Sequence, residues 1–290
     1  MAEIVVLGSG SGPPHTQDRF FTSIILMVNS SCYLLDCGEP ASALMFRNGI
    51  DSFSTRAVFI SHLHPDHIGG LAGLLSSMNF VRRSSSKKFK AWSITRYDDW
   101  YRDAIRFPEQ VVEADKDAKL DLFIPSEGVE GIKKYLDAVY LSPELMPFAL
   151  DISPVENGLF YVDENIKVSA SPNLHLKNNF RYEKLRDTHS KIQMQSYSFM
   201  IEVEGKKIVF SGDIDSLEEL TPFMDGADIL MVEIAHYDPE GIKPFVDRYA
   251  PEQVILIHIH PGLEERIAKL VEEWDDPRIS IAEDGYSLTI

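Results

Sequence analysis

The sequence predicts an α+β domain in which mixed β-sheets are covered by helices. Short apolar runs rich in β-branched residues dominate the middle of the chain, and in the last third they alternate with segments whose apolar residues recur at helical spacing. With 290 residues, 44% of them apolar, the chain is long enough for one large hydrophobic core. We therefore expect one domain over residues 1–290.

Local signals define the first elements. The glycine-rich segment 8–14 ends a first strand and is expected to form a structural turn, because no helix signal follows its proline pair. The segment 29–31 (Asn-Ser-Ser) separates two strand-like runs, as is typical of a hairpin. The elements expected up to residue 80 are strands at 4–7, 22–28 and 32–36, a helix at 41–47, a strand at 57–60 and a helix at 68–78.

Residues 81–118 are charged and aromatic without a clear period, so we interpret them as an insertion. We expect its basic run 82–90 to be a solvated loop, with a surface for charge and stacking contacts as the alternative. The insertion should form a rim that selects substrate, or else an oligomer contact. The elements expected after it are strands at 122–125, 159–162, 166–171, 196–203, 207–211, 229–232, 253–258 and 279–282, and helices at 132–140, 242–249 and 263–274.

Charge and residue composition disfavour several classes of protein. The formal net charge of −17 disfavours a general nucleic-acid binder, whose affinity depends on Lys and Arg that neutralise phosphates. No apolar run approaches the ~18 residues that span a membrane, and the N-terminus lacks the pattern of a signal peptide, so we expect a soluble, cytoplasmic protein. Cys32 and Cys37 are too close along an extended segment to bridge each other, and we expect both to be reduced core residues.

Three histidines and an aspartate fall within six positions, from His62 to His67. His62 and His64 are two residues apart after an apolar run, so at the end of a strand they project to the same side and can bind one ion. Pro65 ends the strand, and the chain then turns so that Asp66 and His67 face a second ion. The run therefore predicts one half of a two-metal site.

The other half must come from remote strand ends, because a two-metal hydrolase needs about seven ligands and leaves room for water and substrate. His175, Asp213 and His258 each follow or end a predicted strand. His260 is the alternative to His258, but it lies beyond the strand. His189 is expected to be a solvated loop residue, with substrate contact as the alternative, and His15 is interpreted in the same way.

Several segments occur in an order that resembles the metallo-β-lactamase-fold superfamily, closest to its ribonuclease Z-like phosphodiesterase branch. They are Leu7-Gly8-Ser9-Gly10-Ser11-Gly12, Leu34-Leu35-Asp36-Cys37-Gly38-Glu39, the histidine run with Gly69-Gly70, Phe210-Ser211-Gly212-Asp213, Val254-Ile255-Leu256-Ile257-His258 and Ala282-Glu283-Asp284-Gly285. The resemblance implies a four-layer αβ/βα sandwich.

The resemblance also implies the ligand sets. It assigns one ion to His62, His64 and His175, the other to Asp66, His67 and His258, and places Asp213 between them. Zinc is the default ion, with manganese and iron as alternatives. Asp36 resembles a carboxylate that orients a ligand histidine, and turn capping is the alternative.

The implied activity is that of a dinuclear metal-dependent hydrolase, a phosphodiesterase that cleaves a small or nucleotide-type diester through a metal-bridging hydroxide. Asp66 would hold or accept the proton of that water. Only 38 positions separate His175 from Asp213, which leaves little room for a long RNA-binding arm and favours a small anionic substrate over nucleic acid. A thioesterase or lactonase on the same site is the alternative, and a metal sensor or an oxidoreductase is less favoured. A homodimer and no membrane partner are expected.

His236 is the candidate general acid for the leaving oxygen. It follows the predicted strand at 229–232, at the end where the metal ligands are expected. Histidine has the unperturbed pKa best suited to protonate an alkoxide near neutral pH. The alternative is a loop histidine that pairs with Glu233 or Asp238.

Overall fold

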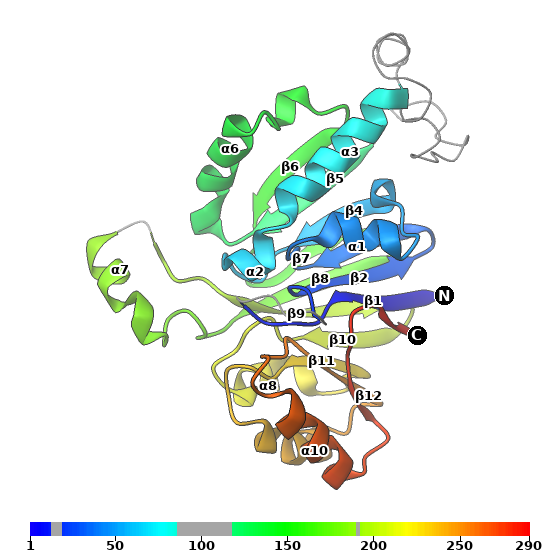
Figure 1. Ribbon diagram of the computed structural model, residues 1–290, viewed down its shortest axis with the longest axis vertical. Coiled ribbons are helices and arrows are strands. Elements are labelled where there is room, and N and C mark those ends of the chain that lie inside the picture. The colour runs from blue at the N-terminus through cyan, green and yellow to red at the C-terminus, as the bar shows by residue number, and fades with distance from the viewer. Residues whose placement is uncertain (13–18, 86–117, 190–191) are drawn as a thin grey trace.

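Two seven-stranded sheets form the centre of the computed structural model, which describes residues 1–12, 19–85, 118–189 and 192–290 (Figure 1). The first sheet has the order β14 (Tyr286–Thr289), β1 (Ala2–Gly8), β2 (Ser23–Val28), β3 (Ser31–Leu35), β4 (Thr55–Phe59), β5 (Lys119–Ile124) and β6 (Ala149–Pro154). The second has the order β13 (Ile279–Ile281), β12 (Gln253–Ile257), β11 (Ile229–Glu233), β10 (Lys206–Phe210), β9 (Tyr197–Val203), β8 (Ile166–Pro172) and β7 (Gly158–Val162).

Helices cover the outer face of each sheet (Figure 1). The first sheet is covered by α1 (Ala41–Arg47), α3 (Leu71–Ser85) and α6 (Val129–Ala138), and the second by α8 (Thr221–Met224), α9 (Ile242–Tyr249) and α10 (Glu264–Trp274). The shorter elements are α2 (Pro65–Ile68), α7 (Glu183–Thr188), η1 (Ser52–Ser54), η2 (Ser126–Gly128), η3 (Pro143–Leu145), η4 (Phe180–Tyr182), η5 (Leu217–Leu220) and η6 (Pro239–Gly241). The predicted α+β class and four-layer αβ/βα sandwich are confirmed.

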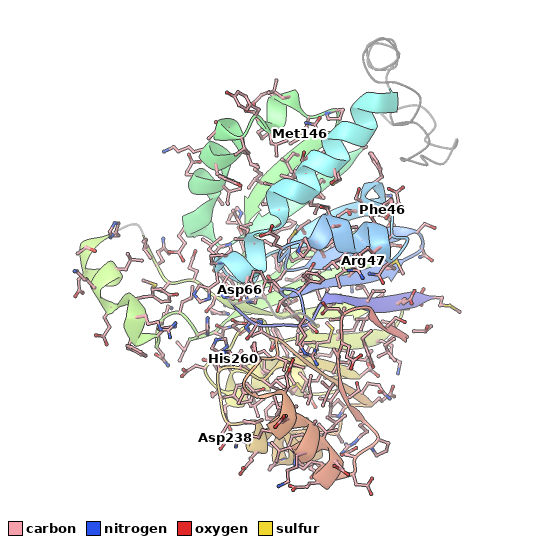
Figure 2. All side chains as sticks on the ribbon, viewed as in Figure 1. Phe46, Arg47, Asp66, Met146, Asp238 and His260 are labelled. Carbon is pink, nitrogen blue, oxygen red and sulfur yellow. The ribbon has the colours of Figure 1, made fainter. Side chains whose placement is uncertain are left out.

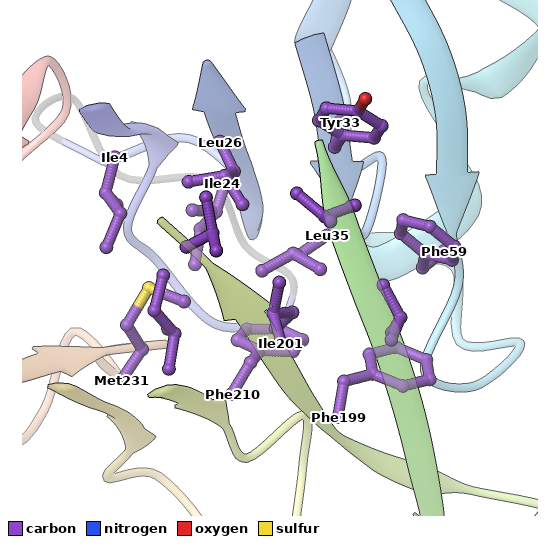
Figure 3. Close-up of a cluster of buried hydrophobic side chains, with 14 of the residues drawn as sticks. Ile4, Ile24, Leu26, Tyr33, Leu35, Phe59, Phe199, Ile201, Phe210 and Met231 are labelled. Atoms are coloured by element: carbon purple, nitrogen blue, oxygen red, sulfur yellow. The ribbon is translucent and has the colours of Figure 1, made fainter. Parts of the chain in front are cut away.

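The inner faces of the two sheets enclose a buried apolar core (Figure 3). Alternate residues of each strand face inward, and Leu26 and Leu35 of the first sheet lie opposite Ile201 and Phe210 of the second. Phe59 packs its ring against Phe199, with 6.3 Å between the ring centroids. This core holds the strand ends of both sheets at a constant separation, which a site built from both sheets requires.

Strand direction brings the candidate ligands to one end of the sandwich. In the first sheet β3 and β4 are parallel, and β1 runs the same way because β2 is antiparallel to both β1 and β3. In the second sheet β10, β11 and β12 are parallel, and β8 shares their direction because β9 is antiparallel to both β8 and β10. The carboxyl ends of parallel strands lie at the same edge of a sheet.

Some predicted elements differ from the observed ones. The hairpin of β2 and β3 is confirmed. The helix expected at 68–78 is divided into α2 and α3 by Gly69 and Gly70, and the edge strands β6 and β14 were not predicted. The insertion expected at 81–118 stays a prediction: α3 extends into its first residues, as far as Ser85, and residues 86–117 lie outside the described residues.

Two smaller expectations concern the thiols and the membrane. Cys32 and Cys37 are both free and buried, as expected. Across the described ranges, we find no helix with the length and apolar character needed to span a bilayer.

Candidate metal centre

The loops after β1, β3, β4, β8, β10, β11 and β12 meet at one end of the sandwich. Figure 2 labels Asp66 on α2 and His260 after β12 at this end. The loops contact each other directly, since Ser11 N donates to the carbonyl of Ile259 and Gly12 N donates to Oδ2 of Asp66.

The histidine run lies just beyond β4 rather than on its last residues. Strand pairing between β4 and β5 ends at Phe59, so His62 and His64 occupy the following loop. His64 has extended backbone (φ −65°, ψ 145°), and Pro65 opens α2. Asp66 and His67 therefore project from the first turn of a helix, which separates them from the first pair of histidines.

Two close backbone approaches place α2 against the loop after β3. A Cβ on Gly38 would lie 2.5 Å from the carbonyl oxygen of Asp66, and a Cβ on Gly70 would lie 2.5 Å from that of Gly38. Only glycine allows these contacts. Cys37 N then donates to the carbonyl of His67, at 2.7 Å, which ties the two segments together.

The first cluster joins His62, His64 and His175 to Asp213. Nε2 of His62 lies 2.9 Å and Nε2 of His175 lies 3.5 Å from Nδ1 of His64. Oδ2 of Asp213 lies 3.6 Å from Nε2 of His62 and 3.7 Å from Nε2 of His175. Each residue offers one donor atom within 4.8 Å of the others, a spacing suited to donors that lie about 2 Å from one shared ion.

The second cluster joins Asp66, His67 and His258. Oδ2 of Asp66 lies 3.6 Å from Nε2 of His67 and 4.0 Å from Nε2 of His258. Oδ2 of Asp213 lies 3.3 Å from both of these histidine nitrogens. The structure thus brings together all seven predicted ligands, with one oxygen of Asp213 between the two clusters.

The donor set fits divalent metal ions. Among the residues that the structure describes, Nε2 of His67 and both carboxylate oxygens of Asp213 are buried without a hydrogen-bond partner. Buried charged groups in proteins are paired or coordinate metals, because an unpaired one is costly. Imidazole nitrogen and carboxylate oxygen are donors that zinc, manganese and iron accept.

The outward nitrogens of four ligand histidines have partners of their own. The pairs are His62 Nδ1 with Ser61 Oγ at 3.0 Å, His67 Nδ1 with Asp36 Oδ2 at 2.7 Å, His258 Nδ1 with Thr22 Oγ1 at 2.7 Å, and His64 Nε2 with the Tyr182 hydroxyl at 2.7 Å. Such partners fix the ring orientation and tautomer of a ligand histidine. Asp36 takes the orienting position that the family resemblance implied. Thr22 and Tyr182 carried no local signal, because they are remote from their partners in sequence.

Burial keeps several of these histidines neutral. It lowers the pKa of His175 and of His258 to about 3 and that of His62 well below its ordinary value. A neutral imidazole has the lone pair that a metal requires. His67 is the exception: burial lowers its pKa, but the carboxylates of Asp213 and Asp36 outweigh it and raise that pKa well above its ordinary value. Burial raises the pKa of Asp213, but the surrounding imidazoles outweigh it and hold that pKa well below its usual range.

In the described part of the glycine-rich loop after β1, residues 9–12 donate their backbone amides to other protein groups. Ser9 N donates to Oδ1 of Asp284, Gly10 N to the carbonyl of Phe20 and Ser11 N to that of Ile259. Gly12 N donates to Asp66, at 2.8 Å. The loop is therefore a structural support for Asp66, in agreement with the expected turn.

His236 lies at the mouth of the clusters. Its Nδ1 is 3.2 Å from Oε1 of Glu233 and 3.7 Å from Oδ2 of Asp213, and its ring is partly exposed. Burial lowers the pKa of His236, but the hydrogen bond to Glu233 and the charges of Asp213 and Glu233 outweigh it and raise that pKa to about 9. The pairing with Glu233, which the sequence analysis gave as the alternative to a general acid, is present.

The remaining histidines lie elsewhere. His260 is exposed, and its Nδ1 accepts from Gly262 N at 3.1 Å. His189 is exposed beside Thr188. His15 lies outside the described residues.

Sequence profiles of two families match this chain. The profile described as Anti-Pycsar protein Apyc1 matches residues 2–97. The profile described as Beta-lactamase superfamily domain matches residues 103–274, more than half of the chain. The chain belongs to the beta-lactamase superfamily.

Within this superfamily the chain is similar to ribonuclease Z. It is 30% identical over 184 residues to Ribonuclease Z of Listeria monocytogenes serotype 4b, an alignment that covers 62% of this chain and 48% of the relative. The chain thus spans about half the length of that relative. It is 25% identical over 314 residues to Ribonuclease Z of Shouchella clausii, which covers 98% and 96% of the two chains.

A solved member of the superfamily has the same fold. The crystal structure of human tRNase Z, short form, superimposes with a TM-score of 0.67 and 17% identity, covering 99% of both chains. At this identity the likeness establishes the metallo-β-lactamase fold and not the substrate.

Proposed function

We propose that this chain is a dinuclear, zinc-dependent hydrolase that acts as a phosphodiesterase on a small or nucleotide-type diester. The observation that carries the proposal is the position of Asp213, whose Oδ2 lies within 3.7 Å of a ring nitrogen of His62, His175, His67 and His258. A single carboxylate oxygen between two donor clusters is suited to bridge two ions.

The seven ligands would be divided as the sequence analysis assigned them. The first ion would be held by His62, His64 and His175, the second by Asp66, His67 and His258, and Asp213 would bridge. When bound, the two ions would lower the pKa of a water molecule and polarise a phosphoryl oxygen. Asp66 and Asp213 contribute only two negative charges, so the loaded site stays positive and favours an anionic substrate.

Two side chains of the site are suited to move protons. Oδ2 of Asp66 is held by Gly12 N and faces the second cluster, where it can accept the proton of the attacking water. Nδ1 of His236 is held by Glu233, which leaves Nε2 to donate a proton to the leaving oxygen. We propose these roles for Asp66 and His236.

RNA is the second candidate substrate. The two relatives compared above are named Ribonuclease Z, and the segment between β8 and β9 exposes Lys177, Arg181 and Lys184 at the same end of the sandwich. The net charge of −17 favours a small diester instead, because long nucleic acid would be repelled by the rest of the surface.

The test is a substrate panel with zinc-loaded protein. Bis(p-nitrophenyl) phosphate, nucleotide diesters, single-stranded RNA, aryl thioesters and lactones would be compared, with metal content measured by elemental analysis. Asp213→Ala and His64→Ala should each lower diester hydrolysis by at least ~100-fold, because each removes a ligand. The exposed carboxylate variant Asp225→Ala is the matched control and should keep full activity.

Each outcome decides between candidates. If the protein hydrolyses a thioester or lactone but no diester, the assignment as a hydrolase stands and the assignment as a phosphodiesterase is rejected. Cleavage of RNA alone would favour the second candidate. Less than one metal ion per chain after purification with added zinc would reject the two-metal site.

A further inference from the structure

An arm joins β8 to β9 beside the metal centre. We define the arm as residues 173–189 and 192–195. It carries η4 and α7, and α7 stands apart from both sheets at the left of Figure 1. Phe180 is 75% exposed and Leu185 is 36% exposed, so the part of the arm that carries η4 and α7 is not in the core. Leu176 and Met194, near the two ends of the arm, are buried.

Both ends of the arm are tied to the sandwich. On the outgoing side Leu174 N donates to Oε1 of Glu219 at 2.9 Å, and Nδ2 of Asn178 donates to Oδ2 of Asp215 at 2.7 Å. On the returning side Gln195 N donates to Oε1 of Glu127, at 2.7 Å. The base of the arm is therefore held in a defined position.

The returning end is also connected to the histidine run. Glu127 lies in η2, whose last residue Gly128 would place a Cβ 2.7 Å from Cδ1 of Leu63. Leu63 stands between His62 and His64 in the chain. The returning end of the arm is therefore bonded to Glu127, and the next residue, Gly128, is a close neighbour of the segment that carries two candidate ligands.

The middle of the arm contacts a candidate ligand directly. The hydroxyl of Tyr182, in η4, lies 2.7 Å from Nε2 of His64. Nδ1 of His64 faces Nε2 of His62 and Nε2 of His175. If Nδ1 keeps its lone pair for an ion, the ring proton is on Nε2, which then donates to the oxygen of Tyr182.

His64 differs from the other paired ligands in where its partner lies. Ser61, Asp36 and Thr22, the partners of His62, His67 and His258, are buried in loops of the sandwich. His64 is only partly buried, and its partner belongs to the arm. Of the four histidines with such a partner, His64 is therefore the one whose ring orientation depends on the arm.

We propose that Tyr182 is a positioning residue that orients His64 and couples the arm to the metal centre. The inference rests on the proposed function in one respect, namely that His64 is a metal ligand. The hydroxyl of Tyr182 sets the tautomer and ring angle of His64, as the buried partners do for the other paired histidines. The arm thereby acts on the centre through a ligand and not only through contact with substrate.

The experiment compares Tyr182→Phe with the wild type. This change removes only the hydroxyl and keeps the aromatic ring. Zinc affinity would be measured by competition with a chromophoric chelator, and ligand geometry by the visible absorption of the cobalt-substituted protein. Tyr140→Phe is the matched control, because Tyr140 is 83% exposed and follows α6, outside the arm and the histidine run.

Tyr182→Phe should bind its more weakly held zinc ion about 10–100-fold less tightly, and its cobalt spectrum should change. With a diester substrate kcat should fall while KM changes little, because the hydroxyl serves His64 and not the substrate. Tyr140→Phe should match the wild type in every readout.

Three results would overturn the proposal. The first is a Tyr182→Phe variant whose zinc affinity and cobalt absorption are unchanged. If Tyr182→Ala is impaired while Tyr182→Phe is not, the ring of Tyr182 contributes only by packing. Another is a raised KM with unchanged zinc affinity, which would make Tyr182 a substrate contact. The third is a wild type that binds no zinc, which rejects the proposed function as well. A wild type that binds zinc but cleaves no diester rejects the phosphodiesterase alone, since the zinc and cobalt readouts still decide the role of Tyr182.

Discussion

Oδ2 of Asp36 lies 2.7 Å from Nδ1 of His67, and both side chains are fully buried. Ser61 donates its backbone N–H to Oδ1 and its hydroxyl to Oδ2 of the same carboxylate. Asp36 has a φ of 59°, a left-handed conformation that costs a non-glycine residue about 1 kcal/mol or more. The surrounding contacts hold this strained residue in place, with the result that Nε2 of His67 points at Asp213.

Asp36→Asn should weaken zinc binding about 10–100-fold, because an amide has one acceptor and one donor where the carboxylate has two acceptors. Either Ser61 or His67 then faces an N–H group, and the free energy of unfolding should fall by about 1–3 kcal/mol. Chelator competition and urea unfolding measure the two effects, with exposed Asp225→Asn as the control. Equal zinc affinity in Asp36→Asn and wild type would contradict the orienting role.

His236→Ala should slow diesters with poor leaving groups by roughly 100-fold or more and spare aryl leaving groups, which depart without a proton. Steady-state rates with an alkyl and an aryl diester check this. Equal slowing of both substrates would point to a metal or folding defect. If neither substrate were slowed, His236 would have only a structural role, as the partner of Glu233.

Gly70→Ala should destabilise the fold by about 1–3 kcal/mol, because its Cβ would lie 2.5 Å from the carbonyl oxygen of Gly38 and force the backbone to move. Gly131→Ala is the opposite case, since Gly131 is exposed in α6 and its Cβ would meet nothing within 4 Å. That change should stabilise the protein by roughly 0.5–1 kcal/mol. Thermal unfolding of the two variants should therefore shift in opposite directions, and a shared direction would contradict this account.

Asp163 makes the stability of the sandwich depend on pH. Burial raises the pKa of this carboxyl, but hydrogen bonds from Tyr33, Tyr161 and the backbone of Asn165 and Ile166 outweigh it and lower that pKa. Tyr33 belongs to the first sheet and Tyr161 to the second, so the carboxylate joins the two sheets through their hydroxyls. A depressed folded-state pKa contributes stability above the unfolded value of about 4 and loses it as the pH falls through the folded value.

Asp163→Asn should therefore cost about 1–3 kcal/mol at pH 7 and progressively less below about pH 4, where the wild type also loses the charge. Urea unfolding at several pH values measures the difference between the two proteins. Asp225→Asn should show a constant, small difference over the same range. If the difference in unfolding free energy between wild type and Asp163→Asn grew as the pH fell, this explanation would be contradicted.

Elements that are specified by the pattern of neighbouring residues were predictable from the sequence. The hairpin of β2 and β3 was found because its turn lies between two adjacent apolar runs. The two edge strands of the first sheet, β6 and β14, were missed. β14 is short and pairs Leu288 with Ile4 near the other end of the chain. Nothing in a local window specifies such a pairing. The break between α2 and α3 follows from the close approach of Gly70 to Gly38, a contact across two loops.

The candidate ligands were predictable as residue types at strand ends, and their partners were not. His175, Asp213 and His258 each follow a strand, which a periodic pattern reveals. Thr22 is remote in sequence from His258, and Tyr182 from His64, and each pair meets only through the packing of loops from different elements. Hydrogen bonds of this kind leave no pattern in sequence.

By itself the sequence determined the α+β fold class, the two candidate ligand pairs of the histidine run and the strand ends where further candidate ligands stand, because all three depend on the period and spacing of neighbouring residues. Only the tertiary structure decided that one oxygen of Asp213 lies within 3.7 Å of four histidine nitrogens, that the histidine which Asp36 contacts is His67, and that the arm reaches His64. These relationships arise where loops of two separate sheets meet, and the packing of the core between the sheets sets their distances.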